Sequence, residues 1–406
     1  MKKFKIITTA LVLSVMMAGC TALAKNETQQ TSAEGNVISS VEELSITDKD
    51  LVTDYEESEA EEIRLTDSTG TVKITEAGAY IITGSTSDGM IIVEASEEDD
   101  VQLILRDASI TSSSSAAIYV ISADEVYITL EGENSLANGG AFEAIDENDI
   151  DAVIYAKDDL TINGSGSLKI TSPAGHGIVC KDDMVIASGT FDITASEDGI
   201  NTNESLAIVD CDMTVNAGDD AVHTDGMLQI GGGTLNITAA EGLEGTYIVI
   251  NDGKISISAS DDGINAAQKS DAYAPTVEIN GGEITIVMGQ GDTDGIDSNG
   301  NIVINGGTID ITGQFAVDYI GTATLNGGTL IINGEETDTI PNQFMGGAGG
   351  GMMNGAQGDP GFDPRSSGER QMPEDFDPEN MPQMPQDGGN GLGTPGERSD
   401  RQQEAG

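Results

Sequence analysis

The sequence predicts an all-β protein whose main body is a parallel β-helix, a stack of coils built from short strands and turns. One observation is a small residue within a recurring acidic motif, at positions 177, 199, 221, 242, 263, 295 and 316. A second is a turn such as Asn305-Gly306-Gly307, followed by alternating apolar residues, which keeps step with the first motif. The shared spacing is 21 or 22 residues, interrupted once by an insertion. Two markers in register at one spacing indicate one structural unit stacked many times.

The length and pattern of each unit favour strands. A unit is too short to hold a strand, a crossover helix and a second strand. Its apolar residues alternate with a period of two, as in Thr308-Ile309-Asp310-Ile311, which is typical of strands. Coils of short strands stack about 4.8 Å apart, and Asn-Gly-Gly supplies the positive φ of a sharp corner. A β-sandwich of hairpins, the alternative, does not require such a register.

The first twenty residues have the pattern of an export signal. Lys2, Lys3 and Lys5 precede an apolar stretch at 6–17 that is too short to span a membrane. The sequence Met17-Ala18-Gly19-Cys20 then resembles a bacterial lipobox, with Met in place of the usual Leu. We therefore expect residues 1–20 to be a lipoprotein signal peptide, and Cys20 to be lipidated and to anchor an exported protein on the extracellular face of the cell membrane. The alternative is a plain secretory signal with an incidental cysteine.

Composition divides the rest of the chain into three parts. Residues 21–62 are rich in Thr, Ser, Glu and Gln and predict a flexible acidic tether. Residues 63–340 carry the β-helix. Residues 341–406 are rich in Gly, Met, Pro and Asp and predict a disordered tail, because they have too few apolar residues to offset the entropy of ordering.

The body has looser units at its start and two insertions. Short strands are expected from about residue 62 to 123, and Gly89, Ala117 and Ala152 are expected to extend the column of small residues. The insertions are 131–151 and 268–275; such loops often gather on a binding face, or are harmless. Cys180 and Cys211 occupy places in the unit that do not stack, so no disulfide is predicted.

The charge of the chain excludes some partners. There are 70 acidic residues against 17 basic ones, a formal net charge of −53. Nucleic acid and anionic membrane are polyanions, so we do not expect either as a direct partner. Cations are expected to matter, and nothing in the sequence indicates an oligomer, so we expect a monomer.

Stacking of the coils would place the acidic residues in columns. One column is Asp198, Asp220, Glu241, Asp262 and Asp294, with Glu197, Asp219 and Asp261 one residue before it and Asn201, His223, Glu244, Asn265, Asp297 and Asp318 three residues after it. Two charges 5 Å apart repel by roughly 3 kcal/mol at the effective dielectric of a protein surface. No arginine occurs between residues 182 and 364, and the only lysines there are Lys254 and Lys269.

Hard cations between the carboxylates would relieve this repulsion, and Ca²⁺ suits flexible oxygen ligands better than Mg²⁺ does. The predicted metal ligands are Asp198, Asp219, Asp220, Asp261, Asp262, Asp294, Glu241, Asp297, Asn201 and Asn265. The alternative is a solvated acidic edge that discourages aggregation. His223 alone does not make a zinc site.

The N-terminal strands and the acidic units together resemble one bacterial family. The run from Ile74 to Gly84, the strands at 101–105 and 117–120, and the repeated Asp-Gly-Ile units are similar to the carbohydrate-binding-domain-containing family of exported proteins, over about residues 60–340. The resemblance implies a right-handed parallel β-helix of pectate-lyase-like shape without established catalysis. It also implies binding of calcium and of acidic polysaccharide such as polygalacturonate, with some affinity for cellulose. Asp198, Asp219, Asp220, Asp261, Asp262 and Asp294 match the acidic turns of that family, whereas Ala240 and Phe315 depart from them.

Three functions are compared on this basis: a calcium-dependent carbohydrate-binding protein, a polysaccharide lyase or hydrolase, and a structural or adhesive surface protein. A lyase needs a base beside the sugar carboxylate, and Lys181, Lys254 and Lys269 are not expected to cluster. Carboxylate pairs suited to a glycosidase are too plentiful here to be informative. The chain has no Trp, and its Tyr and Phe are scattered in sequence, which argues against crystalline cellulose as the main ligand. We therefore expect a polysaccharide-binding protein without catalytic residues.

Overall fold

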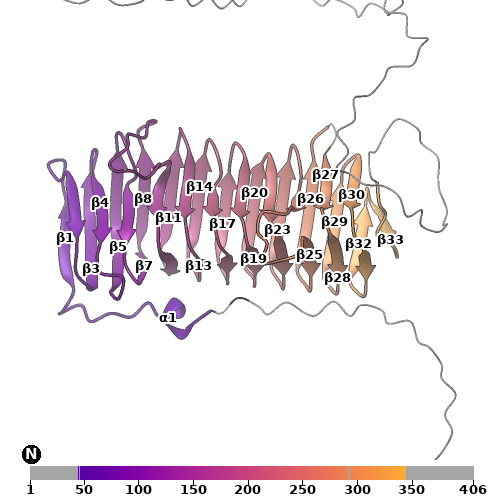
Figure 1. Ribbon diagram of the computed structural model, residues 1–406, viewed down its shortest axis with the longest axis horizontal. Coiled ribbons are helices and arrows are strands. Elements are labelled where there is room, and N and C mark those ends of the chain that lie inside the picture. Colours follow the sequence, from indigo (N-terminus) through magenta and orange to yellow (C-terminus); the bar gives the residue numbers. More distant parts are fainter. Residues whose placement is uncertain (1–43, 45, 291–292, 344–406) are drawn as a thin grey trace, which may run out of the picture. The chain divides into compact units, whose positions relative to one another are not determined.

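The computed structural model describes Leu44, residues 46–290 and residues 293–343. The predicted signal peptide with Cys20, the first part of the predicted tether and the predicted tail from residue 344 onward lie outside the described residues. The described chain winds into a long parallel β-helix with strands on three faces (Figure 1). The predicted fold class is confirmed.

The 11-stranded sheet, called sheet B, forms one face. Its strands are β2 (Thr71–Ile74), β4 (Met90–Glu94), β6 (Ile118–Ser122), β9 (Ala152–Ala156), β12 (His176–Cys180), β15 (Ile200–Thr202), β18 (Asp220–Thr224), β21 (Glu241–Gly245), β24 (Ile264–Ala266), β27 (Asp294–Ser298) and β30 (Phe315–Tyr319).

The 22-stranded sheet, sheet A, covers the other two faces. Face A1 contains β1 (Glu61–Leu65), β3 (Gly78–Thr86), β5 (Asp100–Ser112), β7 (Glu125–Glu131), β10 (Asp159–Gly164), β13 (Met184–Ile186), β16 (Leu206–Ile208), β19 (Met227–Ile230), β22 (Tyr247–Ile250), β25 (Thr276–Ile279), β28 (Asn301–Ile304) and β31 (Ala323–Leu325). Face A2 contains β8 (Glu133–Asn138), β11 (Ser167–Ser172), β14 (Thr190–Ala195), β17 (Asp212–Asn216), β20 (Thr234–Ala239), β23 (Lys254–Ala259), β26 (Glu283–Met288), β29 (Thr308–Thr312), β32 (Thr329–Ile332) and β33 (Glu335–Thr337). The long strand β5 pairs with both β7 and β8 and so joins the two faces.

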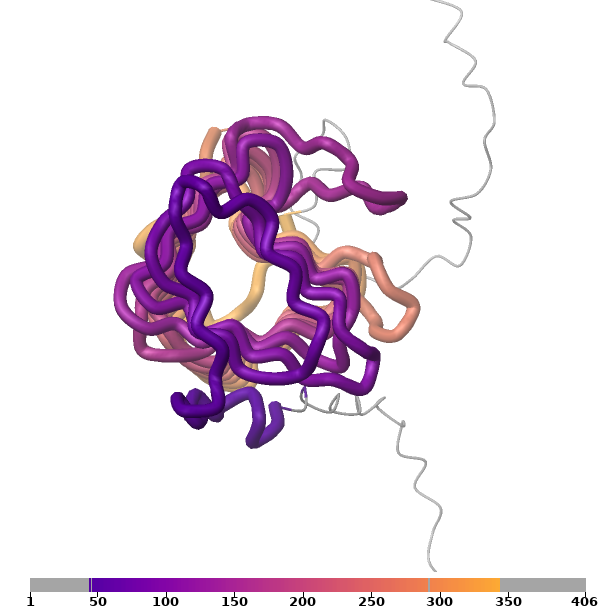
Figure 2. Tube along the Cα trace, turned by 90° about the vertical axis from the view of Figure 1, so that its left-hand side faces the viewer, coloured from indigo at the N-terminus to yellow at the C-terminus, as the bar shows by residue number. Residues whose placement is uncertain are grey.

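Each coil runs from sheet B to face A1, then to face A2 and back. Seen from the N-terminal end in Figure 2, the chain turns clockwise as it recedes, which makes the helix right-handed. The strand pairs are parallel, except that β33 folds back antiparallel on β32 at the C-terminal end.

Stacked apolar residues fill the interior. On sheet B, one column of fully buried side chains passes through every coil from residue 178 onward: Ile178, Ile200, Val222, Leu243, Ile264, Ile296 and Val317. The residue before each of these is small because of close packing. A Cβ added at Gly263, for example, would lie 2.4 Å from the carbonyl oxygen of Gly295 and 2.6 Å from Cγ2 of Ile286. The small-residue column thus marks a line of tight contact between coils.

The register confirms Ala117 as a member of this column but corrects two others. Ile91 pairs with Ile118, and Ile118 with Ile154, so Met90 and Val153 occupy the places expected for Gly89 and Ala152. These first coils contain more residues than the later ones, with 27 from Ile91 to Ile118 and 36 from Ile118 to Ile154. The insertion at 131–151 is also shorter than expected, because residues 133–138 form β8 and only 139–151 leave the coil.

The turns between faces A1 and A2 are held by stacked asparagines. Gly307 has φ of +84°, as the Asn-Gly-Gly motif predicts. Asn326 donates from Nδ2 to Oδ1 of Asn305, and Asn305 donates in the same way to Asn280, at 2.8 and 2.7 Å. The regular recurrence of the motif within this chain therefore reflects both a backbone requirement and a ladder of amide hydrogen bonds. Cys180 and Cys211 are buried free thiols, as expected.

The last part of the predicted tether packs on the β-helix. Leu44 and residues 46–60, called the strap below, lie along face A1 and contain α1 (Asp48–Leu51) before β1 begins at Glu61. Thr47 caps α1 and forms a capping box with Asp50. The polar composition of the strap suggested a flexible segment, but side-chain hydrogen bonds to face A1 hold it. Among the described residues, no helix is long and apolar enough to cross a membrane.

Candidate functional site

The outer face of sheet B carries the predicted acidic columns. The column Asn201, His223, Glu244, Asn265, Asp297 and Asp318 is in register from coil to coil, as the sequence predicts. Loops 139–151 and 268–275 project from the two corners that border this sheet (Figure 2). The acidic face thus lies between the two insertions.

The second predicted column lies at the start of the strands of sheet B, and its carboxylates also bond to the backbone. Oδ1 of Asp198 accepts the N–H of Asp220 at 3.0 Å, and Oδ1 of Asp262 accepts the N–H of Asp294 at 3.0 Å. Asp220 pairs with Glu241 in register. At these two steps the column therefore ties one coil to the next, besides presenting charge.

Buried carboxylates gather most closely around Asp220. Ligand atoms of Asp220, Glu241 and Glu244 all lie within 4.8 Å of one another, as do those of Asp198, Asp220 and His223. Asn201 donates from Nδ2 to Oδ2 of Asp198 at 2.7 Å. The fold thus brings together residues from three successive coils.

Two basic side chains stand among these carboxylates: His223, which the sequence already placed in the column, and Lys269, whose approach the sequence did not indicate. Nδ1 of His223 lies 2.9 Å from Oδ2 of Asp220 and 2.6 Å from Oε2 of Glu244, and Nζ of Lys269 lies 2.9 Å from Oε1 of Glu244. Lys269 belongs to the insertion 268–275, which folds back toward sheet B. The place of Lys269 in space could not be predicted, because an insertion has no equivalent positions in the other coils.

A second histidine lies at the N-terminal end of the column. Nδ1 of His176 lies 3.2 Å from Oδ2 of Asp198, and its Nε2 lies 3.0 Å from Oε2 of Glu197. Burial opposes the charge of this imidazole, but the hydrogen bond with Asp198 and the nearby carboxylates raise the pKa of His176. Asp198 is 4% exposed, and its contacts with His176 and Asn201 outweigh burial and lower its pKa.

The central carboxylates have strongly divergent pKa values. Burial, followed by the charges of Asp220, Glu244 and Asp262, raises the pKa of Glu241 to about 8. Burial disfavours a charge on Glu244 as well, but its bonds to His223 and Lys269 hold its pKa below the usual range. Burial disfavours the charged imidazole, yet the hydrogen bonds to Asp220 and Glu244 raise the pKa of His223 to about 10. At neutral pH, His223 is therefore an imidazolium that counters two of these carboxylates.

The C-terminal half of the face differs. Burial, with the charges of Asp262 and Asp318, raises the pKa of Asp297 to about 6. Asn265 is 8% exposed and donates from Nδ2 to Oε2 of Glu241 at 2.9 Å, while its buried Oδ1 has no hydrogen-bond partner among the described residues. An unpaired acceptor beside mutually repelling carboxylates is an environment that favours a cation.

The structure separates the ten predicted ligands into groups. It gathers Asp198, Asn201, Asp220 and Glu241 at the end neutralised by histidines and Lys269, and it places Asp262, Asn265, Asp294 and Asp297 on the coils that follow. Asp219 and Asp261 are exposed at the turn before the strand and do not join the buried group. Side chains at adjacent positions of an extended chain point in opposite directions, which explains the difference.

The sequence analysis missed an aromatic half of the same face. Tyr119, Tyr155 and Val179 precede Asn201 in its column. The two tyrosine rings meet edge to face with centroids 5.8 Å apart, and Nζ of Lys181 lies 5.6 Å from the Tyr155 centroid. The tyrosines looked scattered because loop 139–151 separates their coils in sequence. Alignment of 118–120 with 154–156 would have paired them.

Loop 139–151 covers the two tyrosines. Tyr119 is fully buried and donates its hydroxyl to Oδ2 of Asp146 at 2.7 Å, and Asn148 donates to the same hydroxyl at 2.8 Å. Phe142 and Ile150 pack against the pair. In this conformation, the aromatic half stabilises the loop.

The fold and the site together define a parallel β-helix protein with a long acidic face flanked by two loops. A family model for carbohydrate-binding domain-containing proteins matches residues 68–242 and 219–342, and the chain belongs to this family.

The chain is also similar to a protein sequence and to a solved structure. A "carbohydrate-binding domain-containing protein" of Acetivibrio thermocellus is 35% identical over 128 residues, which are 30% of this chain and 45% of that protein. The chain therefore matches less than half of that relative's length. A solved structure described as the polysaccharide lyase-like protein from C. thermocellum, as a gadolinium derivative, is 26% identical with a TM-score of 0.39 and covers 66% of this chain and 86% of its own.

Proposed function

We propose that the protein is a non-catalytic, calcium-dependent carbohydrate-binding protein that holds acidic polysaccharide, such as polygalacturonate, along the outer face of sheet B. The observation that carries the proposal is the in-register column Asn265, Asp297 and Asp318, in which one amide and two carboxylates follow one another at the coil spacing. The family to which the chain belongs supports carbohydrate as the ligand.

The described residues suit calcium better at one end of the face than at the other. Near Glu244, the charged His223 and Lys269 already supply positive charge. On the following coils, carboxylate and amide oxygens are hard ligands of the kind that Ca²⁺ prefers. Asp262, Asn265, Asp294 and Asp297 are the residues we expect to hold it first, and the other predicted ligands extend the same face. Bound calcium would supply the positive charge that lets a polyanionic sugar approach a polyanionic protein.

A lyase is the first alternative, because Lys269 does lie beside the acidic column. A general base must be free to take a proton. The bonds that Lys269 and His223 make to carboxylates outweigh burial and raise both pKa values, so both side chains are held in their charged form. This favours binding over elimination. A structural or adhesive surface protein is the second alternative.

We also propose export, with Cys20 lipidated and the chain held as a monomer on the extracellular face of the cell membrane. The signal-like sequence at 1–20 supports this proposal. Mass spectrometry of the membrane fraction would show a diacylglycerol adduct on Cys20, and a Cys20→Ala variant would appear in the medium. Recovery of the native chain in the medium without the adduct, as for Cys20→Ala, would contradict the anchor.

A pull-down on polygalacturonate tests the function. We expect retention in calcium, release by chelator, and at least tenfold weaker retention for Asp297→Asn, with Asp310→Asn on face A2 as the matched control. Formation of unsaturated products, followed by ultraviolet absorbance, would show a lyase instead. Absence of both retention and products would leave the structural role.

A further inference from the structure

The strap is fixed to face A1 at several separate places. The N–H of Leu44 donates to Oε1 of Gln229 at 2.9 Å, α1 packs against β10, and the hydroxyl of Tyr55 donates to Oε1 of Glu131 at 2.9 Å. These contacts join residues up to 185 positions apart in the chain. The strap thus lies outside the stack of coils, and Figure 1 shows α1 beside it.

The centre of the strap is a buried carboxyl group. Asp50 is 4% exposed, and its Oδ2 accepts the N–H of Thr47 at 2.6 Å. Asn163 on β10 donates from Nδ2 to the carbonyl oxygens of Asp50 and Val52 at 3.0 and 3.1 Å. The carboxyl group of Asp50 is therefore held against face A1 by the backbone around it.

Two carboxyl groups meet at one hydroxyl group beneath α1. Oγ1 of Thr161 lies 2.9 Å from Oδ1 of Asp50 and 2.8 Å from Oε1 of Glu125. A hydroxyl group has a single hydrogen and can make only one linear bond as a donor. Both contacts are satisfied only when one of the two carboxyl groups carries a proton and donates it.

We infer that the strap is a proton-dependent latch, which binds face A1 when the Asp50–Glu125 pair holds one proton and is released when that proton is lost. The latch lies on face A1 and does not depend on the proposed carbohydrate or calcium site, which lies on sheet B. Burial, with the charge of Asp50, raises the pKa of Glu125 to about 7 and so supports Glu125 as the proton carrier.

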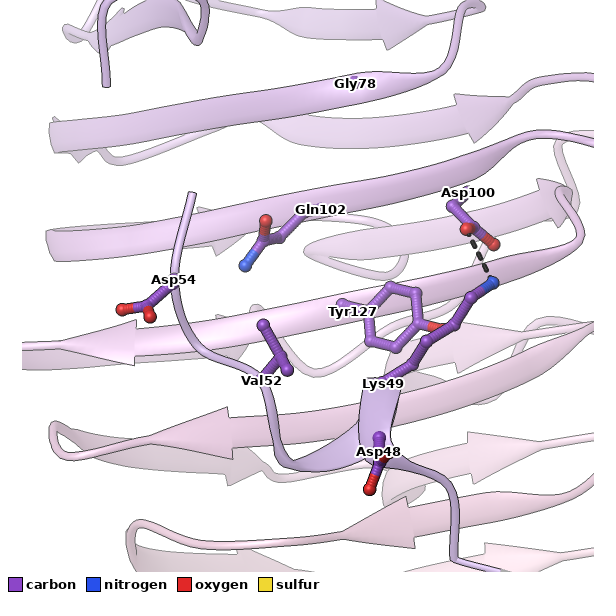
Figure 3. Close-up of a pocket in the computed structure, with 8 residues that line it drawn as sticks. All are labelled: Asp48, Lys49, Val52, Asp54, Gly78, Asp100, Gln102 and Tyr127. Atoms are coloured by element: carbon purple, nitrogen blue, oxygen red, sulfur yellow. Dashed lines mark hydrogen bonds and ion pairs between the residues drawn. The ribbon is translucent and has the colours of Figure 1, made fainter. Parts of the chain in front are cut away.

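The groups around the pair give little help to a second negative charge. Lys49 is a cation near Glu125, but its Nζ bonds to Oδ2 of Asp100 at 2.9 Å, and Asp124 also acts on it. Tyr127 donates its hydroxyl to Glu125. Two further strap carboxylates, Asp48 and Asp54, line the adjacent pocket of about 420 Å³ (Figure 3). A second charge on the pair would enter a region with more carboxylates than cations.

The direction of the pH effect follows from the raised pKa. Between pH 4.5, the ordinary pKa of a glutamic acid, and about 7, the docked strap binds one more proton than the free strap, so docking weakens as pH rises across this range and is constant above it. Loss of one proton weakens docking at most tenfold per pH unit. Release would leave β1 as the first fixed element and would free roughly 55 Å of extended chain. If Cys20 anchors the chain as proposed above, the latch would set how far the β-helix can move from the membrane.

Hydrogen–deuterium exchange of the full chain tests the latch between pH 5.5 and 8.5. The readout is the protection of the strap amides at 47, 50 and 52, relative to a synthetic peptide of the same sequence at each pH. We expect protection to fall between pH 5.5 and about 7 with a slope approaching tenfold per unit, and to level off above pH 7. In Glu125→Gln, whose amide is neutral and can donate to Thr161, protection should not change with pH.

Asp50→Asn serves as a second neutral variant, and Glu283→Gln, an exposed carboxyl on face A2, serves as the matched control. Constant protection in either neutral variant, with the native slope in the control, supports the latch. Three results would overturn it: constant protection in the native chain, the native slope in both neutral variants, or loss of protection at every pH in both.

Discussion

Replacing Lys269 by methionine tests whether the insertion 268–275 neutralises the acidic face. Nζ of Lys269 lies 2.9 Å from Oε1 of Glu244, a carboxylate whose side chain is 6% exposed. Removing one partner of a fully buried pair costs about 3–5 kcal/mol. The Lys269 side chain is 34% exposed, so water screens part of the interaction, and His223 still contacts Glu244. We therefore expect a loss of about 1–2 kcal/mol in chelator.

The assay is urea unfolding at pH 7.5, with chelator and with calcium. Lys254→Met is the matched control, because Nζ of Lys254 lies 3.9 Å from Glu283 and both side chains are well exposed. Such a surface pair contributes only about 0.3 kcal/mol. If calcium binds the same face, it should replace part of the lost charge, and Lys269→Met should lose less stability in calcium than in chelator. A loss no larger than that of Lys254→Met in chelator would refute the reasoning about charge.

Three more predictions concern the same body. Gly263→Val should destabilise the chain by more than about 3 kcal/mol in urea unfolding, because its side chain would overlap the next coil, whereas Gly70→Ala, with open space around it, should change stability by less than about 0.5 kcal/mol. Calcium should raise the melting temperature and chelator should lower it, and superimposable calorimetric traces would contradict the metal site. Asp262→Lys should bind less calcium, and unchanged uptake would show that calcium binds elsewhere. Because burial raises the pKa of Glu241 from 4.5 to about 8, the folded chain holds this proton more tightly than the unfolded chain, and stability in chelator should fall between those pH values; Glu241→Gln should flatten this dependence, and an unchanged profile would contradict it.

Much of the fold could be predicted because a coiled stack repeats its requirements. Every coil must place a small residue where Gly263 meets the next backbone, and a residue with positive φ where Gly307 turns. These demands recur at one spacing and are therefore visible in a single sequence. The first coils do not keep the spacing of 21 or 22 residues, and there the small-residue column was assigned one position off at Gly89 and Ala152.

The candidate site was predictable only where it belongs to the repeat. The columns through Asp220 and Asn265 could be predicted, because the constant spacing of the repeat fixes which residues of neighbouring coils pair. The position of Lys269 did not, because an insertion has no counterpart in other coils to fix its direction. The contact between Tyr119 and Tyr155 was hidden by the insertion between their coils, and the docking of Asp50 was hidden by the polar composition around it.

The sequence by itself determined the parallel stack, its spacing and the alignment of acidic residues on one face. It could do so because neighbouring coils pair residue by residue, and a local pattern repeated at constant spacing becomes a column in space. The tertiary structure decided which charges in that column are countered, through His223 and Lys269, and where the strap lies. Those contacts join segments whose separation along the chain follows no period, so only the folded chain brings them together.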